Sequence, residues 1–123
     1  MIENKIVRIG HKKAIAHIKL KLNGYRSVWR RVYVGATAHP QRRWVSHASD
    51  GWTKMVLLYK AFTPEIVQAM ERNLIENARQ SNFLLDLENV APGGEGVVRI
   101  PRPNYLYVLV ADRRAWHQPL PSN

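Results

Sequence analysis

Apolar and polar residues alternate along two neighbouring stretches near the start of the chain. In residues 14–22, Ile18 and its apolar neighbours at positions 20 and 22 are separated by histidine and lysine, and residues 28–35 repeat the pattern. A period of two is typical of half-buried strands. Residues 23–27 lie between the two stretches and include an Asn-Gly pair, which favours a turn. The pattern predicts a β-hairpin.

The register of this hairpin depends on the length of its loop. A two-residue Asn-Gly loop would place Arg31 on the apolar face, whereas a longer loop pairs Ile18 with Val32. We prefer the longer loop because directly opposed residues share a face, so the branched aliphatics then gather on one side. On the other side this register places His17 opposite Tyr33.

Most of the chain that follows divides into segments bounded by proline, glycine and asparagine. Pro40 is suited to the first turn of a helix, and Thr63-Pro64-Glu65 combines a capping hydroxyl, a proline and an acid. The expected elements are a short strand at 5–9, a helix at 41–48, a strand at 54–61, a helix at 63–79, a loop at 91–96, and strands at 97–100 and 105–111. We expect a single α+β domain, residues 1–123, with a small mixed or antiparallel sheet flanked by helices.

Composition and charge narrow the functional classes. The 123 residues contain 19 Lys and Arg against 9 Asp and Glu, a formal net charge of +10, and no cysteine. The charge favours a polyanionic partner, and the absence of cysteine excludes disulfide scaffolds, zinc ribbons and thiol nucleophiles. No apolar run approaches the roughly 20 residues of a membrane helix, and the first residues lack the apolar centre of a signal peptide. We therefore expect a cytoplasmic protein with no membrane partner.

Glu71 is an unusual residue in the predicted helix at 63–79. It falls within the apolar stripe that includes Val67, Met70, Leu74 and Ile75. Burying an unpaired carboxylate costs several kcal/mol, so Glu71 needs a partner. One interpretation is a salt bridge to a basic residue. The other is a metal ligand, because Mg²⁺ is usually held by one or two carboxylates together with phosphate and water.

Basic and aromatic residues are intermingled in the first half of the chain. This mixture suits a nucleic-acid surface, with cations for phosphates and rings for bases; a merely solvated basic face is the alternative. Arg43 and His47 are four residues apart and share one face of the predicted helix at 41–48. Gly35 indicates a close backbone approach by another group. The residues expected to bind nucleic acid are Lys19, Lys21, Arg30, Arg31 and Arg42.

Four short motifs, taken in order, resemble the GIY-YIG nuclease superfamily. Tyr33-Val34-Gly35-Ala36-Thr37, followed by Arg43 and His47, resembles the second half of its signature, and Glu71-Arg72-Asn73-Leu74-Ile75 resembles its glutamate helix motif. Asn82-Phe83-Leu84-Leu85 is similar to its late asparagine motif. The resemblance covers a core of residues 14–90, and residues 91–123 would be a C-terminal extension with an extra strand pair. The first Gly-Ile-Tyr motif is absent, and the predicted hairpin places His17 at its tyrosine position.

The resemblance implies an endonuclease that hydrolyses DNA, most readily double-stranded DNA, with Mg²⁺ or Mn²⁺. Glu71 would hold the metal, Arg43 would bind the scissile phosphate, and Tyr33 would activate or position water. His47, His17 and Asn82 complete the expected catalytic set. Cutting both strands would need a homodimer or two visits. The alternatives are a catalytically degenerate nucleic-acid-binding or inhibitor protein and, less favoured, a basic structural protein.

Overall fold

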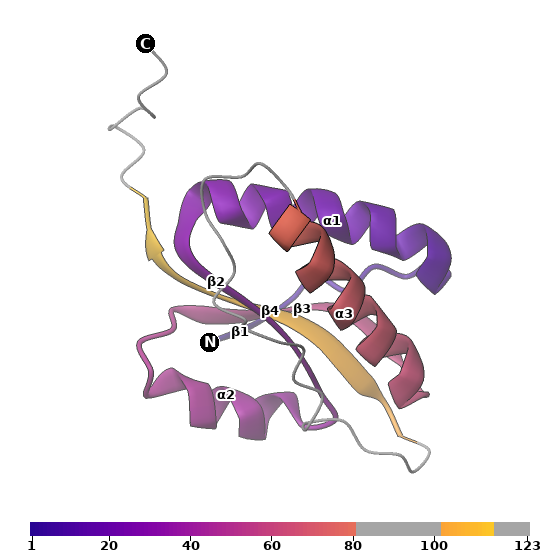
Figure 1. Ribbon diagram of the computed structural model, residues 1–123. Helices are drawn as coiled ribbons and strands as arrows, with labels where there is room; N and C mark the ends of the chain where they lie inside the picture. The colour runs from indigo at the N-terminus through magenta and orange to yellow at the C-terminus, as the bar shows by residue number, and fades with distance from the viewer. Residues whose placement is uncertain (81–101, 115–123) are drawn as a thin grey trace.

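The computed structural model describes residues 1–80 and 102–114 as one four-stranded mixed sheet with three helices, an α+β fold (Figure 1). In the described residues, the strands stand in the order β1-β3-β4-β2. The elements along the chain are β1 (Ile2–Asn4), α1 (His11–Val28), β2 (Trp29–Thr37), α2 (Pro40–Ala48), β3 (Lys54–Ala61), α3 (Pro64–Gln80) and β4 (Asn104–Arg113).

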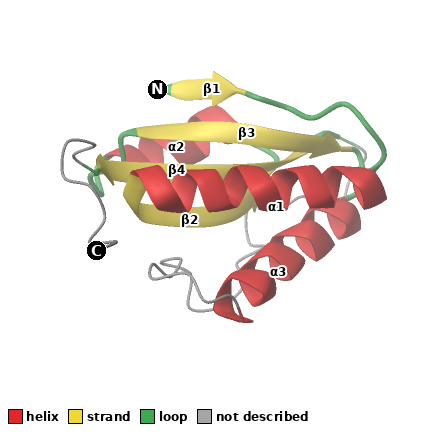
Figure 2. Cartoon of the chain, turned by 90° about the horizontal axis from the view of Figure 1, so that it is seen from above, coloured by secondary structure: helices red, strands yellow, loops and turns green. Residues whose placement is uncertain are grey.

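The helices lie on both faces of the sheet. α1 and α3 cover one face, and α2 lies against the other (Figures 1 and 2). The larger core forms under α1 and α3, where Ile18 and Leu74 are fully buried against strand residues such as Val34. A smaller core on the α2 side includes Tyr107 and Trp52, with Trp44 of α2 packed against it.

β4 lies in the centre of the sheet. It pairs antiparallel with β2 on one side and with β3 on the other, while β1 runs parallel to β3. The strand expected at 105–111 is therefore confirmed, but it is a central strand and not a peripheral addition to a core ending at residue 90. Its expected partner at 97–100 lies outside the described residues.

The predicted hairpin at 14–35 is wrong in its first half, because residues 14–22 belong to α1. Ala14, Ile18 and Leu22 are four residues apart and all buried, which is helical spacing. Leu20, which the alternating pattern placed beside them, is 72% exposed. Only β2 forms from the predicted pair, and it finds its antiparallel partner in β4. The predicted register of Ile18 with Val32 is therefore wrong as well.

The elements after β2 agree closely with the sequence prediction. α2 and α3 begin at Pro40 and Pro64, and β3 spans the predicted 54–61. At the chain start the strand is displaced, because β1 is Ile2–Asn4 and not 5–9. The next residues still follow β3, since the amides of Lys5 and Val7 donate to the carbonyls of Leu57 and Leu58. Within the described residues, no helix has the length and apolar character needed to cross a membrane.

Candidate active site

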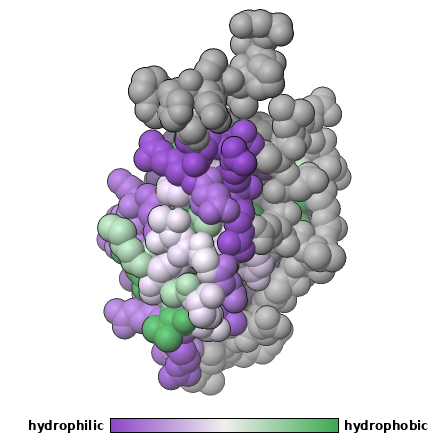
Figure 3. All heavy atoms as spheres, turned by 90° about the vertical axis from the view of Figure 1, so that its left-hand side faces the viewer, coloured by the Kyte–Doolittle hydropathy of each residue, from purple (hydrophilic) through white to green (hydrophobic). Residues whose placement is uncertain are grey.

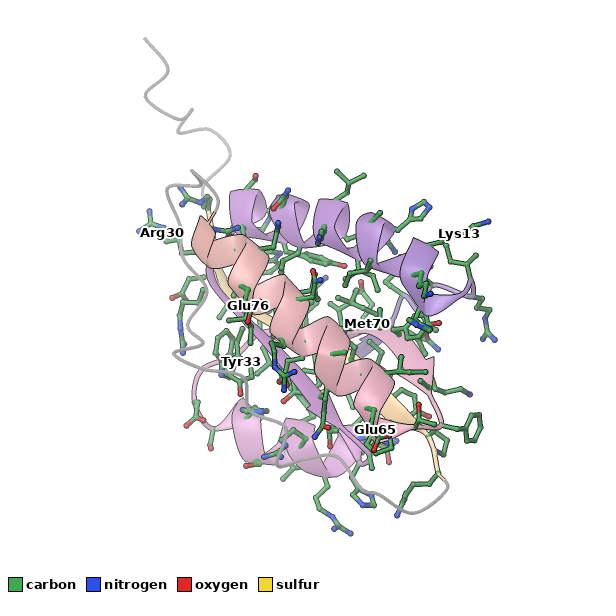
Figure 4. All side chains as sticks on the ribbon, turned by 45° about the vertical axis from the view of Figure 1, so that its right-hand side comes forward. Lys13, Arg30, Tyr33, Glu65, Met70 and Glu76 are labelled. Carbon is green, nitrogen blue, oxygen red and sulfur yellow. The ribbon has the colours of Figure 1, made fainter. Side chains whose placement is uncertain are left out.

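Tyr33 lies in the middle of β2, on the sheet face that α2 covers. Its ring is half-buried and packs against the smaller core, with the ring of Trp52 at 6.2 Å between centroids. Figure 4 shows Tyr33 on the α2 side of the helix α3. Because β2 is an edge strand, this side chain is held by the sheet but remains partly accessible.

Tyr107 is the residue of the candidate site that sequence reasoning missed. β4 pairs it directly with Gly35, so its side chain points to the same face as that of Tyr33. A Cβ atom on Gly35 would lie 2.9 Å from Cε2 of the Tyr107 ring, and closer still to its Cζ and hydroxyl oxygen. This confirms the close approach that Gly35 indicated, and the approaching group is a phenol. The signal for it was present in β4, where Tyr107 alternates with residues of the other face.

Tyr33, Tyr107 and His47 form a compact group, here called the tyrosine–histidine cluster. His47 Nε2 and the Tyr107 hydroxyl form a hydrogen bond of 3.1 Å. The ring centroids are 5.7 Å apart for Tyr33 and His47, 6.0 Å for His47 and Tyr107, and 6.5 Å for the two tyrosines. Two strands and one helix thus bring two phenols and an imidazole to one place.

The charge state of His47 is set by its surroundings. Partial burial is the largest influence and lowers the imidazole pKa; the positive charge of Arg43 lowers it further, while Asp50 opposes the shift. His47 is therefore neutral at pH 7, with a ring nitrogen available as a proton acceptor. Arg43 and His47 are four residues apart on α2 and therefore share one side of the helix.

His17 does not belong to this site, and its predicted position opposite Tyr33 is wrong. It lies on the exposed face of α1, which covers the other side of the sheet. The physical reason is the helical structure of residues 11–28, which removes the strand that would have carried it. The strand position beside Tyr33 is filled by β4.

Glu71 is 1% exposed within α3, as its place in the apolar stripe predicted. α3 packs on the sheet face that α1 also covers, so Glu71 is buried beneath α3 and the sheet separates it from the tyrosine–histidine cluster on the α2 side. Its carboxylate offers the hard oxygen donors that Mg²⁺ prefers. Among the described residues no group of three or more His, Cys, Asp or Glu side chains could hold a metal. A metal at Glu71 would therefore need phosphate and water to complete its coordination. Asn82 lies outside the described residues.

The five basic residues expected to bind nucleic acid are divided between the two sides of the sheet. Lys19 and Lys21 are on α1, whereas Arg42 is exposed on α2. Arg31 stacks on Trp52 with its guanidinium carbon 4.3 Å from the ring centroid, and its Nη1 donates to the carbonyl of Asp50 at 3.1 Å. Arg30 is exposed at the start of β2, at the opposite end of the molecule from Lys13 (Figure 4).

The start of β2 and the end of β4 form a mixed surface of cations and rings. Lys54 and Arg113 both lie near the Trp29 ring, 5.7 and 6.0 Å from its centroid. Seen from this side, hydrophilic side chains dominate the described surface, with less polar ones between them (Figure 3). Such pairing of cations with aromatic faces is compatible with binding to a nucleic-acid strand.

Comparison with known proteins gives no relative for this chain. No family model matches it, and neither the curated proteins nor the solved structures contain a match. The evidence on its function is therefore the arrangement of its own side chains, above all the tyrosine–histidine cluster and Arg43.

Proposed function

We propose that this chain is a Mg²⁺-dependent endonuclease that hydrolyses phosphodiester bonds in double-stranded DNA. The observation that carries the proposal is the convergence of Tyr33, Tyr107 and His47, with Arg43 on the same helix as His47. A net charge of +10 supports a polyanionic substrate.

The cluster also supplies what the GIY-YIG resemblance lacked. In that resemblance the tyrosine of the first motif belongs on a strand antiparallel to the strand of Tyr33. Tyr107 meets this requirement from β4, which follows the other motifs in the chain. The proposed nuclease core thus has a permuted order of elements, with the first-motif strand supplied from the C-terminal side.

Arg43 is the proposed phosphate ligand. A guanidinium can donate two parallel hydrogen bonds to a phosphate and stays charged at all relevant pH values. Hydrolysis adds negative charge to the phosphate in the transition state, and a fixed cation beside it lowers that barrier. Arg43 therefore binds the substrate and stabilises the charge that develops.

The proton leaves the attacking water through the cluster. A free phenol with a pKa near 10 is a weak base at pH 7, so a phenol alone is insufficient. Neutral His47 can accept the proton of the Tyr107 hydroxyl through their hydrogen bond, which makes that oxygen a better proton acceptor in turn. In this proposal Tyr33 positions the water and Tyr107 with His47 takes up its proton.

The resemblance assigns the metal ion to Glu71, with phosphate and water as the other ligands. α3 holds this carboxylate on the opposite face of the sheet from the cluster, so the assignment rests on the resemblance and not on the geometry. A bound Mg²⁺ supplies charge stabilisation at the phosphate and at the leaving oxygen.

The test is nicking of a supercoiled plasmid in Mg²⁺ and in EDTA. Wild type should cut only with Mg²⁺, and Glu71→Gln and Arg43→Ala should lose about two to three orders of magnitude in rate. Glu76→Gln, which removes an exposed carboxylate from the same helix, should cut as wild type does. Mn²⁺ bound to the protein should enhance the relaxation rate of water protons, and this enhancement should be lost in Glu71→Gln and kept in Glu76→Gln.

Three outcomes would contradict the proposal: cutting that continues in EDTA, a Glu71→Gln protein with the wild-type rate, or no cutting with Mg²⁺. Binding without cutting would favour the alternative, a nucleic-acid-binding or inhibitor protein that keeps the fold. The form of the cut plasmid shows whether the chain acts alone or as a homodimer, because one cluster makes one nick. Nicked circles as the main product favour a single chain, and linear plasmid formed without a nicked intermediate favours a homodimer.

A further inference from the structure

A pocket of about 790 Å³ opens at the beginning of α2, on the face of the sheet that also carries the tyrosine–histidine cluster. It is formed by the first turn of α2, by β1 and β3 through Ile2 and Leu57, and by the approach to β4. We call it the α2 pocket. The side chains that carry the argument are His39, Arg42, Arg102 and Tyr105.

The α2 pocket is positively charged. Arg42 and Arg102 both line it, and none of the described lining residues is acidic. Arg102 Nη2 lies 3.4 Å from His39 Nδ1, within hydrogen-bond distance. The two arginines thus approach one cavity from different parts of the chain, one from α2 and one from the segment before β4.

Arg102 has hydrogen-bonding capacity left over. Its Nε is buried and has no hydrogen-bond acceptor among the described residues. His39 offers no counter-charge to the arginines, because an imidazole is either neutral or cationic; partial burial and then the charges of Arg102 and Arg42 lower its pKa and favour the neutral form. Within residues 1–80 and 102–114, this buried donor lacks an acceptor and the two cations lack a carboxylate, and an anionic ligand would complete both.

The remaining walls are aromatic and apolar. Tyr105, Pro40, Pro103 and Leu57 line the pocket together with the polar groups. A bare anion would leave these walls in contact with water, whereas the sugar or base of a nucleotide can pack against a tyrosine ring. The pocket therefore suits a phosphate that carries a nucleoside.

The position of the pocket relates it to the cluster. Tyr105 and Tyr107 are two residues apart on β4 and share the face that α2 covers. That separation is about 7 Å along a strand, roughly two steps of about 3.4 Å along one strand of duplex DNA. Along the chain, His39 likewise lies about one helical turn before Arg43, and Arg42 lies about one turn before His47.

We propose that the α2 pocket binds a nucleotide unit of the DNA strand, close to the phosphate that is cut. This inference rests on the proposed function for the identity of the strand. Arg42 and Arg102 bind the phosphate of that nucleotide, and Tyr105 contacts its sugar or base. The pocket then sets where along the strand the cluster acts.

The test measures binding by NMR on the full chain in EDTA, so that no cutting occurs. The ring proton signal of His39 is followed during titration with thymidine 5′-monophosphate, inorganic phosphate or thymidine. The monophosphate should give a saturable shift at lower concentration than phosphate, and thymidine should give little. The variant with Arg42→Gln and Arg102→Gln should lose about tenfold or more in affinity.

The matched control is Lys12→Gln with Lys13→Gln, which removes the same charge from exposed positions at the beginning of α1 on the other side of the sheet (Lys13 is labelled in Figure 4). It should bind the monophosphate as wild type does. Arg42→Gln alone, at an exposed position, tests the pocket if the double arginine variant does not fold. No saturable shift, or equal losses in the arginine and lysine variants, would overturn the proposal. Equal binding of phosphate and monophosphate would overturn the nucleotide assignment.

The outcome separates the pocket from the nuclease. Plasmid nicking without monophosphate binding would leave the proposed function standing and refute the pocket. Conversely, monophosphate binding in a chain that never cuts would refute the nuclease. Competition by a thymidine tetranucleotide then distinguishes a strand site from a free-nucleotide site, since a strand site should bind the tetranucleotide more tightly than the monophosphate.

Discussion

The ring of Tyr107 occupies the space that a side chain at position 35 would need. The two residues are paired directly across β2 and β4, and a Cβ on Gly35 would overlap the phenol end of the ring. The glycine therefore fixes where the Tyr107 hydroxyl lies, and that hydroxyl is bonded to His47. A backbone feature of β2 thus determines the geometry of the proposed proton path.

We expect Gly35→Ala to displace the Tyr107 ring. Overpacking of a buried site costs about 1–3 kcal/mol in the free energy of unfolding, and urea denaturation would measure the loss. The control is Gly24→Ala, because a Cβ on Gly24 in α1 meets nothing within 4 Å. That change should stabilise the protein by about 0.5–1 kcal/mol. Equal stability of the two variants would refute the close approach.

The pKa of His47 should respond in opposite directions to two neighbours. Arg43 lowers the pKa and Asp50 raises it, in addition to the larger lowering by burial. Arg43→Gln should therefore raise the His47 pKa, and Asp50→Asn should lower it, as followed by the imidazole proton shifts in an NMR pH titration. A shift of the same sign in both variants would contradict the assigned charges.

The lowered pKa of His47 also makes stability depend on pH. In the unfolded chain the imidazole has its ordinary value of 6.5, so below that pH the unfolded state binds a proton more readily than the folded state does. The contribution of neutral His47 to the free energy of unfolding is therefore complete above about pH 6.5. It is lost as the pH falls through the lower pKa that His47 has in the folded protein. Urea denaturation of wild type between pH 7 and pH 5.5 should show this decline, and His47→Gln should reduce its slope. An equal slope in both proteins would contradict the prediction.

Arg31 and Arg30 are adjacent but should differ in their effect on stability. Arg31 stacks on Trp52 and donates to the carbonyl of Asp50, whereas Arg30 is exposed. Arg31→Gln should cost about 1–2 kcal/mol in the free energy of unfolding. Arg30→Gln should change it by less than about 0.5 kcal/mol. If Arg31→Gln loses no more free energy of unfolding than Arg30→Gln does, the contacts of Arg31 with Trp52 and Asp50 add no stability.

Local signals explain what the sequence predicted correctly. The prolines at 40 and 64 mark helix starts through the fixed φ of their own residue, and the apolar run at 54–61 is bounded by breakers. These features act within a few residues, so no knowledge of distant partners is needed. The same holds for Glu71, whose burial follows from its position in the helical stripe.

α1 shows how a short pattern can fit two structures. Ile18 and Leu22 satisfy both a period of two and a helical spacing of four, and the Asn-Gly pair at 23–24 favoured the turn. Burial of Ala14, Ile18 and Leu22 against the sheet stabilises the helix and outweighs the low helix propensity of Asn and Gly. The choice is made by tertiary packing, which the residues alone do not contain.

Tyr107 was missed for a different reason. The sequence pattern predicts that β2 pairs with the segment directly before it, because neighbouring strands usually pair. Instead β4 enters between β2 and β3 from the other end of the described chain. Pairing between strands so far apart in sequence leaves only an indirect trace, which here was the glycine at position 35.

Two tyrosine hydroxyls should separate activity from stability. Tyr107 bonds His47 in the cluster, whereas the Tyr59 hydroxyl donates to the carbonyl of Ile9 at 2.8 Å and ties the segment before α1 to β3. Tyr107→Phe should lower the nicking rate by about two orders of magnitude, because it removes the proton acceptor next to His47. Tyr59→Phe should keep the rate and lose about 1 kcal/mol in the free energy of unfolding. Plasmid nicking and urea denaturation of both variants measure the contrast. If Tyr107→Phe cuts at the wild-type rate, the Tyr107 hydroxyl has no part in proton transfer, and the hydrogen bond to His47 serves packing alone.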